Sequence, residues 1–444
     1  MRFAPFVSRS AMALVIGTLA LAAQPAFAQK KSKEKEREAA AAAAAAPTIV
    51  PSKAYLPEAK KVQTAYQAKD APALEAALAA ADAVATTPQD KYLQSQFRLQ
   101  LGLMKKDQVI QAAALDGMLD SGLAPAADLS RFNFFSGQFA YNQKDYPKTI
   151  ARMLAAKAAG AKDRDLPLLL MDSYLRTNQL DLALTTAKVA IIDQRAAGER
   201  PADDFFVRTA KALQEAKRRD DVLDILAMRV QDYPQPDIWR NTLFIHMQGA
   251  DKDMTLDTLR LMRSVGALKE RAEVQEYAAL ATESGLPGEV LRVIDDARAK
   301  GIILANDAKF NEVYNAQKAR TVGDKAALDA DAAKGAALPT ARRARSTADA
   351  LFGYGDYAKA AALYQVALDK GDVEADLVNL RLGVAQHLNG SHDTAKATLA
   401  KVGGTRKRLA NLWLVNIANE QAAAAAVTTP ALAPTSPAAP APTS

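Results

Sequence analysis

Turn residues recur through the middle of this 444-residue chain at a nearly constant spacing. Ten turns cover the 321 residues from position 69 to position 390 in nine steps, an average near 36. The turns are centred on Lys69-Asp70, Lys106-Asp107, Lys144-Asp145, Asn178-Gln179, Arg219-Asp220, Asp251, Gly285, Gly323-Asp324, Gly355-Asp356 and Gly390. A repeat of this length, with helix-forming residues between the turns, predicts a linear array of helical hairpins.

The clearest unit begins at Gly355-Asp356-Tyr357. Gly355 permits a turn conformation after one helix, and the aromatic ring of Tyr357 covers the start of the next. Ala360, Tyr364 and Ala367 follow at i, i+4 and i+7, so they lie on one face of that helix. The alanines let two antiparallel helices approach closely, and the aromatic residue fills the space between hairpins.

The composition agrees with close helix packing. The chain contains 97 alanines but only 13 Phe, 12 Tyr and 2 Trp. Alanine has the highest helix propensity and the smallest side chain that still favours a helix. This composition therefore favours helices packed against helices over a sheet.

At these residues the chain resembles the tetratricopeptide repeat family, whose 34-residue units are helical hairpins. The resemblance covers residues 54–402, is strongest at 355–368, and is good at 141–156 and 174–191. It implies an all-α fold, a right-handed α-solenoid of about ten stacked hairpins. The aromatic-x-x-Leu-Gly opening of the family is mostly missing, with Leu382-Gly383 the best match. An irregular helical bundle is the alternative.

The sequence predicts four segments. Residues 1–28 form a secretory signal peptide, with Arg2 and Arg9 before an apolar run and a small-x-small cleavage site at Ala26-Phe27-Ala28. Residues 29–53 are a charged and alanine-rich linker, and residues 54–425 are the solenoid. A solvated capping helix over 405–425 ends the solenoid, with the basic residues at its start exposed. Residues 426–444 are a Pro/Ala-rich tail predicted to be disordered.

The signal peptide predicts export, and its type is typical of a Gram-negative bacterium, which places the mature protein in the periplasm. The apolar run is too short to span a bilayer comfortably, so no integral membrane segment is expected after cleavage. The chain has no cysteine, so it cannot be a lipoprotein. We therefore expect a soluble periplasmic protein, of an oligomeric state that the sequence does not define.

Charge and residue types exclude several functions. The net charge of +7 loses two arginines with residues 1–28 and two further net positive charges with residues 29–46, which leaves about +3. Nucleic-acid binding is therefore not expected. With three histidines and no thiolate ligand, we expect no metal and no cofactor, and we interpret His246, His387 and His392 as packing or surface residues.

The sequence contains none of the common catalytic motifs, so we expect no enzyme activity. One alternative is a peptidoglycan-associated protein, because soluble lytic transglycosylases have a similar helical arm. Their catalytic domain with its general-acid glutamate has no counterpart at this carboxyl end. Another alternative is an accessory protein of polysaccharide or outer-membrane secretion. The favoured interpretation is a scaffold or adaptor that binds other proteins, through peptide segments or helices, in the cell envelope.

The resemblance also implies a binding surface. In tetratricopeptide proteins the first helix of each hairpin lines a groove that accepts a peptide or a helix. Transferring the groove positions to the best-matching units gives seven candidates: Arg131, Phe134, Gln138, Tyr141, Asn142, Asp172 and Arg176. This mixture offers several hydrogen-bond donors beside an aromatic ring. The alternative is that the aromatic residues of 132–141 pack in the core.

Overall fold

The computed structural model describes residues 49–428, in which helices alternate with turns and no strand occurs. The helices are α2 (Leu56–Gln67), α3 (Ala71–Asp82), α4 (Pro88–Lys105), α5 (Gln108–Asp120), α6 (Ala126–Asn142), α7 (Tyr146–Ala158), α8 (Leu166–Arg176), α9 (Leu180–Ala196), α10 (Asp203–Glu215), α11 (Arg219–Asp232), α12 (Pro236–Met247), α13 (Lys252–Ser264), α14 (Arg271–Glu283), α15 (Pro287–Ala299), α16 (Ala308–Arg320), α17 (Asp324–Lys334), α18 (Ala341–Tyr354), α19 (Tyr357–Lys370), α20 (Ala375–Leu388), α21 (His392–Leu399) and α22 (Lys407–Thr428). The predicted signal peptide, most of the linker and most of the tail lie outside the described residues.

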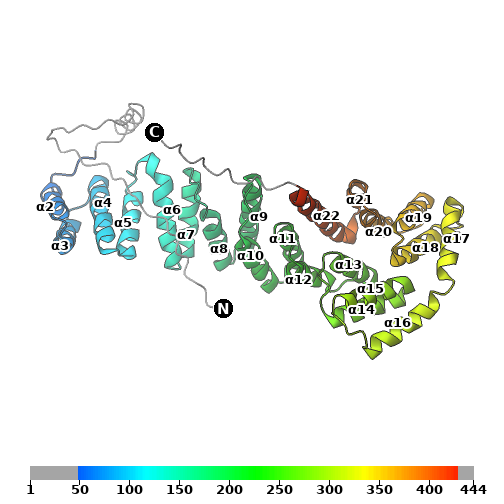
Figure 1. The fold of residues 1–444 in the computed structure, drawn as a ribbon. Helices are drawn as coiled ribbons and strands as arrows, with labels where there is room; N and C mark the ends of the chain where they lie inside the picture. The colour runs from blue at the N-terminus through cyan, green and yellow to red at the C-terminus, as the bar shows by residue number, and fades with distance from the viewer. Residues whose placement is uncertain (1–48, 429–444) are drawn as a thin grey trace, which may run out of the picture. The chain divides into compact units, whose positions relative to one another are not determined.

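The predicted all-α solenoid of helical hairpins is confirmed (Figure 1). Helices α2 to α21 form ten successive helix–turn–helix units, of which the eighth, α16 and α17, is not closed, and α22 follows alone. Each of the ten turns contains one residue with positive φ: Lys69, Lys106, Lys144, Asn178, Lys217, Gly249, Gly285, Gly323, Gly355 and Gly390. In several turns the next residue is an aspartate whose carboxylate caps the second helix, as Asp107 accepts from the backbone N–H of Ile110. The turn spacing therefore sets the hairpin spacing.

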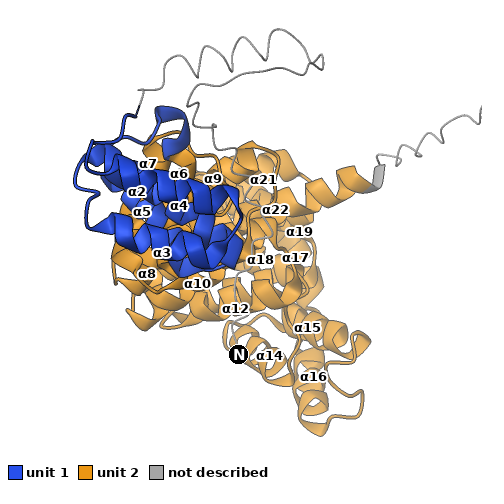
Figure 2. Ribbon diagram, turned by 90° about the vertical axis from the view of Figure 1, so that its left-hand side faces the viewer, with its two compact units in different colours: residues 1–129 blue, residues 130–444 orange. Residues whose placement is uncertain are grey.

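The chain divides into two compact units, residues 1–129 and 130–444 (Figure 2). In the first unit, Tyr55 is fully buried, and its hydroxyl donates to Oε1 of Gln94 at 2.8 Å. Asp90 accepts from the backbone N–H groups of Ser52 and Thr87, which ties the start of α2 to the start of α4. This unit thus combines an apolar core with buried polar contacts between successive hairpins.

The second unit contains one hairpin that is not closed. Helix α16 packs on α15, whereas α17 packs on α18, and the two helices run apart in Figure 1. As a result α15 packs directly on α18. Glycines permit this approach: a Cβ on Gly288 would lie 2.5 Å from the ring of Tyr354, and one on Gly353 would lie 3.1 Å from Cβ of Glu289. The hairpin of α14 and α15 therefore packs directly on the hairpin of α18 and α19, although α16 and α17 lie between them in the sequence.

Helix α22 follows the last hairpin as the predicted capping helix, but it is not fully solvated, because one face of its first half is buried. Trp413 is 1% exposed, and α22 packs against α11 as well as α20 and α21 (Figure 1). Nδ2 of Asn419 donates to the backbone oxygen of Val230 at 3.0 Å. Helix α11 lies almost 190 residues earlier in the chain than the residue of α22 that it contacts. The helices from α11 to α22 therefore form a closed arrangement.

The basic residues at the start of α22 were expected to be exposed, which is correct for Lys407 but wrong for Arg406. Arg406 is buried, and its Nε donates to Glu374 at 2.8 Å. Arg408 forms ion pairs with Asp220 and Asp224 of α11 at 2.9 and 3.2 Å. These arginines have partners because the chain returns to helices that lie far away in sequence.

A buried arginine joins three helices inside this closed arrangement. Arg381 of α20 donates to both carboxylate oxygens of Asp257 in α13, at 3.1 and 3.3 Å, and to both oxygens of Asp349 in α18, at 3.2 Å. Its Nη2 also reaches Asp253 at 2.8 Å. The hydroxyl of Tyr364 donates to Asp349 at 2.6 Å. The contacts to α13 span more than 120 residues of sequence.

A second buried arginine extends this network. Arg260 donates to Asp257 at 2.6 Å and to both carboxylate oxygens of Glu289 at 2.8 and 2.7 Å. Tyr277 donates to the same glutamate at 2.7 Å. Burial alone raises the pKa of Glu289, but the charge of Arg260 and these hydrogen bonds bring that pKa below its ordinary value. Each of these carboxylates is hydrogen-bonded to an arginine, so none is left as an uncompensated buried charge.

We predict that Arg381→Leu lowers the free energy of unfolding of the second unit by about 3–5 kcal/mol, because it leaves Asp257 and Asp349 buried with fewer partners. Chemical denaturation followed by circular dichroism measures this. The control is Lys252→Ala, which removes an ion pair between exposed side chains and should change stability by under about 1 kcal/mol. Equal effects of the two variants would contradict a special role for the buried arginine.

We predict that Gly288→Ala destabilises the protein by about 1–3 kcal/mol, because the new methyl group overlaps the Tyr354 ring. In a Tyr354→Ala background the same change should be neutral or stabilising, because alanine otherwise has the higher helix propensity by about 1 kcal/mol. Urea denaturation of the four proteins in this double-mutant cycle measures the coupling. Additive effects would show that α15 and α18 do not meet at these residues.

Candidate functional site

A polar cluster lies on the first helices of three successive hairpins, α6, α8 and α10. At its centre is Asp172 of α8, which is 3% exposed. Its Oδ2 accepts from the hydroxyl of Tyr141 at 2.8 Å and from Nε of Arg176 at 3.3 Å. Its Oδ1 accepts from Nη1 of Arg208 at 3.0 Å. We call these four residues the Asp172 cluster.

The cluster fixes the orientation of its outer members. Burial and the hydrogen bond to Asp172 together raise the pKa of Tyr141 to about 12, so the phenol stays neutral and keeps donating. Burial opposes the charge of Arg208, but Asp172 and Asp204 raise its pKa above the ordinary value. The side chain of Arg176 remains 48% exposed. The buried carboxylate of Asp172 therefore orients two groups that solvent can reach, the guanidinium of Arg176 and the partly exposed phenol of Tyr141.

The structure brings together three of the seven predicted residues, namely Tyr141, Asp172 and Arg176. On α6, Arg131 and Gln138 are partly exposed and Asn142 is exposed, at positions i, i+7 and i+11 along one side of the helix.

Phe134, also on α6, is 5% exposed and packs in the apolar core with Met153 and Leu170, so its assignment to a binding surface is wrong. Phe132 and Phe139 are buried as well, as the core alternative predicted. Helix α6 buries its phenylalanines because aromatic rings fill the space between hairpins.

Arg208 is the member of the cluster that the sequence interpretation missed. It follows Asp172 by 36 residues, which is one repeat. Oppositely charged residues 29 to 37 positions apart pair at many other places in the structure: Arg195 with Asp232, Arg240 with Glu273, Arg263 with Asp296, Arg271 with Asp307, Arg260 with Glu289, and Asp349 with Arg381. A search for opposite charges one repeat apart would have found this signal.

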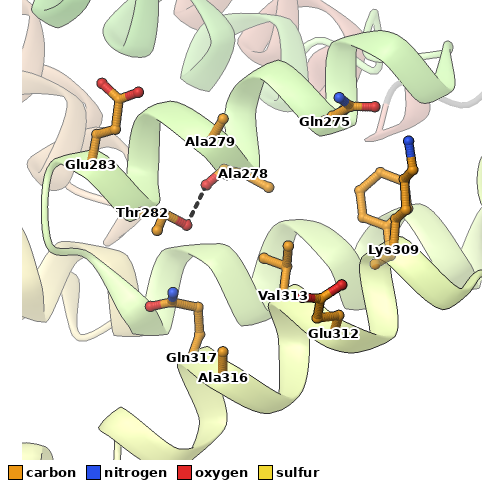
Figure 3. A pocket seen from close by; sticks show the side chains of 11 residues that line it. Gln275, Ala278, Ala279, Thr282, Glu283, Lys309, Glu312, Val313, Ala316 and Gln317 are labelled. Carbon is orange, nitrogen blue, oxygen red and sulfur yellow. Dashed lines mark hydrogen bonds between the residues drawn. The ribbon is translucent and has the colours of Figure 1, made fainter.

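An open groove lies between the first helices α14 and α16, with a volume of about 610 Å³ (Figure 3). Small side chains face it, among them Ala278 and Ala279 from α14 and Ala316 from α16. Gln275 and Lys309 lie at one end of the groove and Glu283 at the other. The groove is mostly apolar with polar ends, a composition that suits a side chain or a short helical segment rather than a charged small molecule.

A second cavity of about 660 Å³ lies beside α7, α8 and α9. Lys157, Leu166 and Val189 contribute to its walls. Helices α7 and α9, the second helices of their hairpins, also carry exposed large apolar side chains, including Leu154 of α7 and Ile192 of α9. The second helices of these hairpins thus also carry an accessible apolar surface.

The three histidines were predicted to be packing or surface residues, and His246 and His387 are buried whereas His392 is partly exposed. His246 is buried against Thr258, and burial lowers its pKa to about 4, which agrees with a packing role. His387 and His392 instead contact each other, with their Nδ1 atoms 3.0 Å apart. Across residues 49–428 no group of three or more His, Asp or Glu side chains is arranged to hold a metal ion. In the same range no helix is both long and apolar enough to cross a membrane.

No family model and no curated protein matches this chain. Among solved structures, the complex of Naa15 and Naa10 bound to HypK-THB matches with a TM-score of 0.34 and 10% identity, over 80% of this chain and 63% of that chain. The chain therefore spans less than two thirds of that protein. The apo form of RapI matches with a TM-score of 0.25 and 11% identity, over 71% of this chain and 97% of that chain.

The Cut9–Hcn1 hetero-tetramer of the APC/C matches with a TM-score of 0.20 and 12% identity, over 82% of this chain and 71% of that chain. TM-scores this far below 0.5 do not define a shared function. The description of this chain as tetratricopeptide-like rests on its own ten hairpins and their turns.

We predict that Asp172→Asn destabilises the protein by about 1–3 kcal/mol, because the neutral amide leaves the three donors around it imperfectly paired. It should also lower the pKa of Tyr141 from about 12, since the carboxylate no longer opposes ionisation. Nuclear magnetic resonance of labelled tyrosine, assigned with Tyr141→Phe, measures this titration. The control Asp181→Asn alters an exposed carboxylate and should leave that titration unchanged.

Proposed function

We propose that this chain is a non-catalytic scaffold that binds a segment of another protein on the face formed by α6, α8 and α10. The observation that carries the proposal is the Asp172 cluster. The first helices of three successive hairpins place polar side chains around one buried carboxylate. These side chains lose their conformational entropy when the protein folds, so binding a partner does not have to order them again. A partner then meets donors that are already oriented.

The chemistry of this face fits a peptide. Arg176 offers an exposed guanidinium for a carboxylate or a backbone carbonyl, and the amides of Gln138 and Asn142 each offer a donor and an acceptor. The side chain of Arg176 also lies 6.0 Å from the ring of Tyr146, so a flat aromatic surface adjoins the charge. Such a mixture recognises backbone and acidic groups of an extended or helical segment.

The buried carboxylates favour a structural role over catalysis. Glu289 and Asp257 are held by arginines inside the second unit, where they join helices and have almost no exposed surface. The pKa of Glu289 lies below its ordinary value, which is opposite to the raised pKa of a general acid. These observations support a non-catalytic scaffold. The peptidoglycan-associated and secretion-accessory alternatives would differ from it in the partner that is bound.

The proposed site of action is the bacterial periplasm, after cleavage of residues 1–28. The partners in this proposal are proteins of the cell envelope, and nucleic acid is not among them. The nearly neutral body of the protein is compatible with a partner recognised by local polar contacts rather than by long-range attraction.

Crosslinking in living cells, with a photoreactive residue introduced at Gln138, tests the proposal. We predict that a discrete protein adduct forms and is identified by mass spectrometry. Arg176→Ala should lower capture by about 10-fold, the loss expected when one well-placed contact is removed from an interface. Lys252→Ala, an exposed change on α13, should leave capture unchanged. Capture of glycan alone, or equal capture by both variants, would contradict the scaffold proposal.

A further inference from the structure

Two of the three histidines in the chain meet at the end of the second unit. His387, near the end of α20, is 4% exposed, and His392 is the first residue of α21. Their Nδ1 atoms lie 3.0 Å apart. Nε2 of His387 lies 3.4 Å from a carboxylate oxygen of Glu420 in α22. The pair therefore has a carboxylate on the far side of the buried ring.

The carboxylate selects the tautomer of the buried histidine. Glu420 is an acceptor, so His387 carries its proton on Nε2 and directs the lone pair of Nδ1 toward His392. The ring is held by the edge-to-face contact with Trp413, at 5.8 Å between centroids, and Glu420 is itself oriented by a hydrogen bond from Asn416 at 2.9 Å. When His392 carries its proton on Nε2, both Nδ1 atoms are unprotonated and lie 3.0 Å apart.

We propose that His387 and His392 bind a divalent transition-metal ion of the Zn²⁺ class through their two Nδ1 atoms. At a Zn–N length of about 2.05 Å, two nitrogens of one ion lie about 2.9 Å apart for an angle of about 90° and about 3.3 Å apart for a tetrahedral angle. The separation of 3.0 Å falls within this range. Imidazole nitrogens prefer Zn²⁺, Cu²⁺ and Ni²⁺ to Mg²⁺ or Ca²⁺. Water supplies the remaining ligands.

Glu420 acts as the partner of a ligand rather than as a ligand. A metal-bound histidine commonly donates its other N–H to a carboxylate, which fixes the ring and increases its basicity. Here that carboxylate belongs to α22, the helix that packs back on α11. The ion would therefore connect α20 and α21 directly and α22 through His387. Its binding should hold the carboxyl-terminal helix in place.

Isothermal titration calorimetry of the untagged full-length protein with ZnCl₂ tests the inference. We expect one Zn²⁺ per chain, an increase in Tm on adding zinc, and slower hydrogen exchange in α22. Affinity should fall as the pH is lowered, because protons compete with the metal ion for the ligand nitrogens. MgCl₂ should produce no heat of binding.

Three variants locate the site. His392→Gln, at the partly exposed ligand, should abolish binding without unfolding the protein, and Glu420→Gln should weaken binding about 10-fold. Asp393→Asn is the matched control beside His392 and should bind as the parent does, because its exposed carboxylate is not a ligand. Absence of binding by the parent, or unchanged binding by His392→Gln, would overturn the proposal and leave the contact as a hydrogen bond between histidines.

Discussion

The pairing of Arg381 with Asp257 and Asp349 is the interaction on which the second unit depends. A solenoid needs contacts only between neighbouring hairpins, but this arginine joins α20 to α13, helices that are more than 120 residues apart. A buried charge is tolerated only when it is fully paired, so the helices that supply the carboxylates must all be in place together. The network therefore makes the folding of these hairpins interdependent, where a simple stack would leave them nearly independent.

The splayed hairpin and the returning helix are consequences of the same closure. Since α15 packs directly on α18, the hairpins after α15 turn back toward those before it, and α22 reaches α11. Gly288 and Gly353 permit the first contact, and Arg408 and Asn419 complete the second. The first helices α6, α8 and α10 keep the accessible polar face on which we place the partner.

The turns of this fold were predictable from sequence, because each follows from a residue with positive φ, often with a capping aspartate next to it. Tyr141, Asp172 and Arg176 were placed on one face by transferring to the repeat register the groove positions of the family that the chain resembles. Phe134 was misplaced because the register does not distinguish the side of a helix that faces a groove from the adjoining core side. Closure through Arg381 and Trp413 was not predicted, since it depends on contacts between residues far apart in sequence, for which neither periodicity nor composition gives a signal.

The central claim, that the helices from α11 to α22 close on themselves, is tested most directly by a distance between those two helices. The chain has no cysteine, so cysteines introduced at the exposed positions Gln231 and Ala418 would carry the only spin labels. Because Asn419 contacts the backbone of Val230, the closed arrangement predicts one narrow, short distance by double electron–electron resonance. A long or broad distribution in the otherwise unchanged protein would contradict closure and indicate an open solenoid.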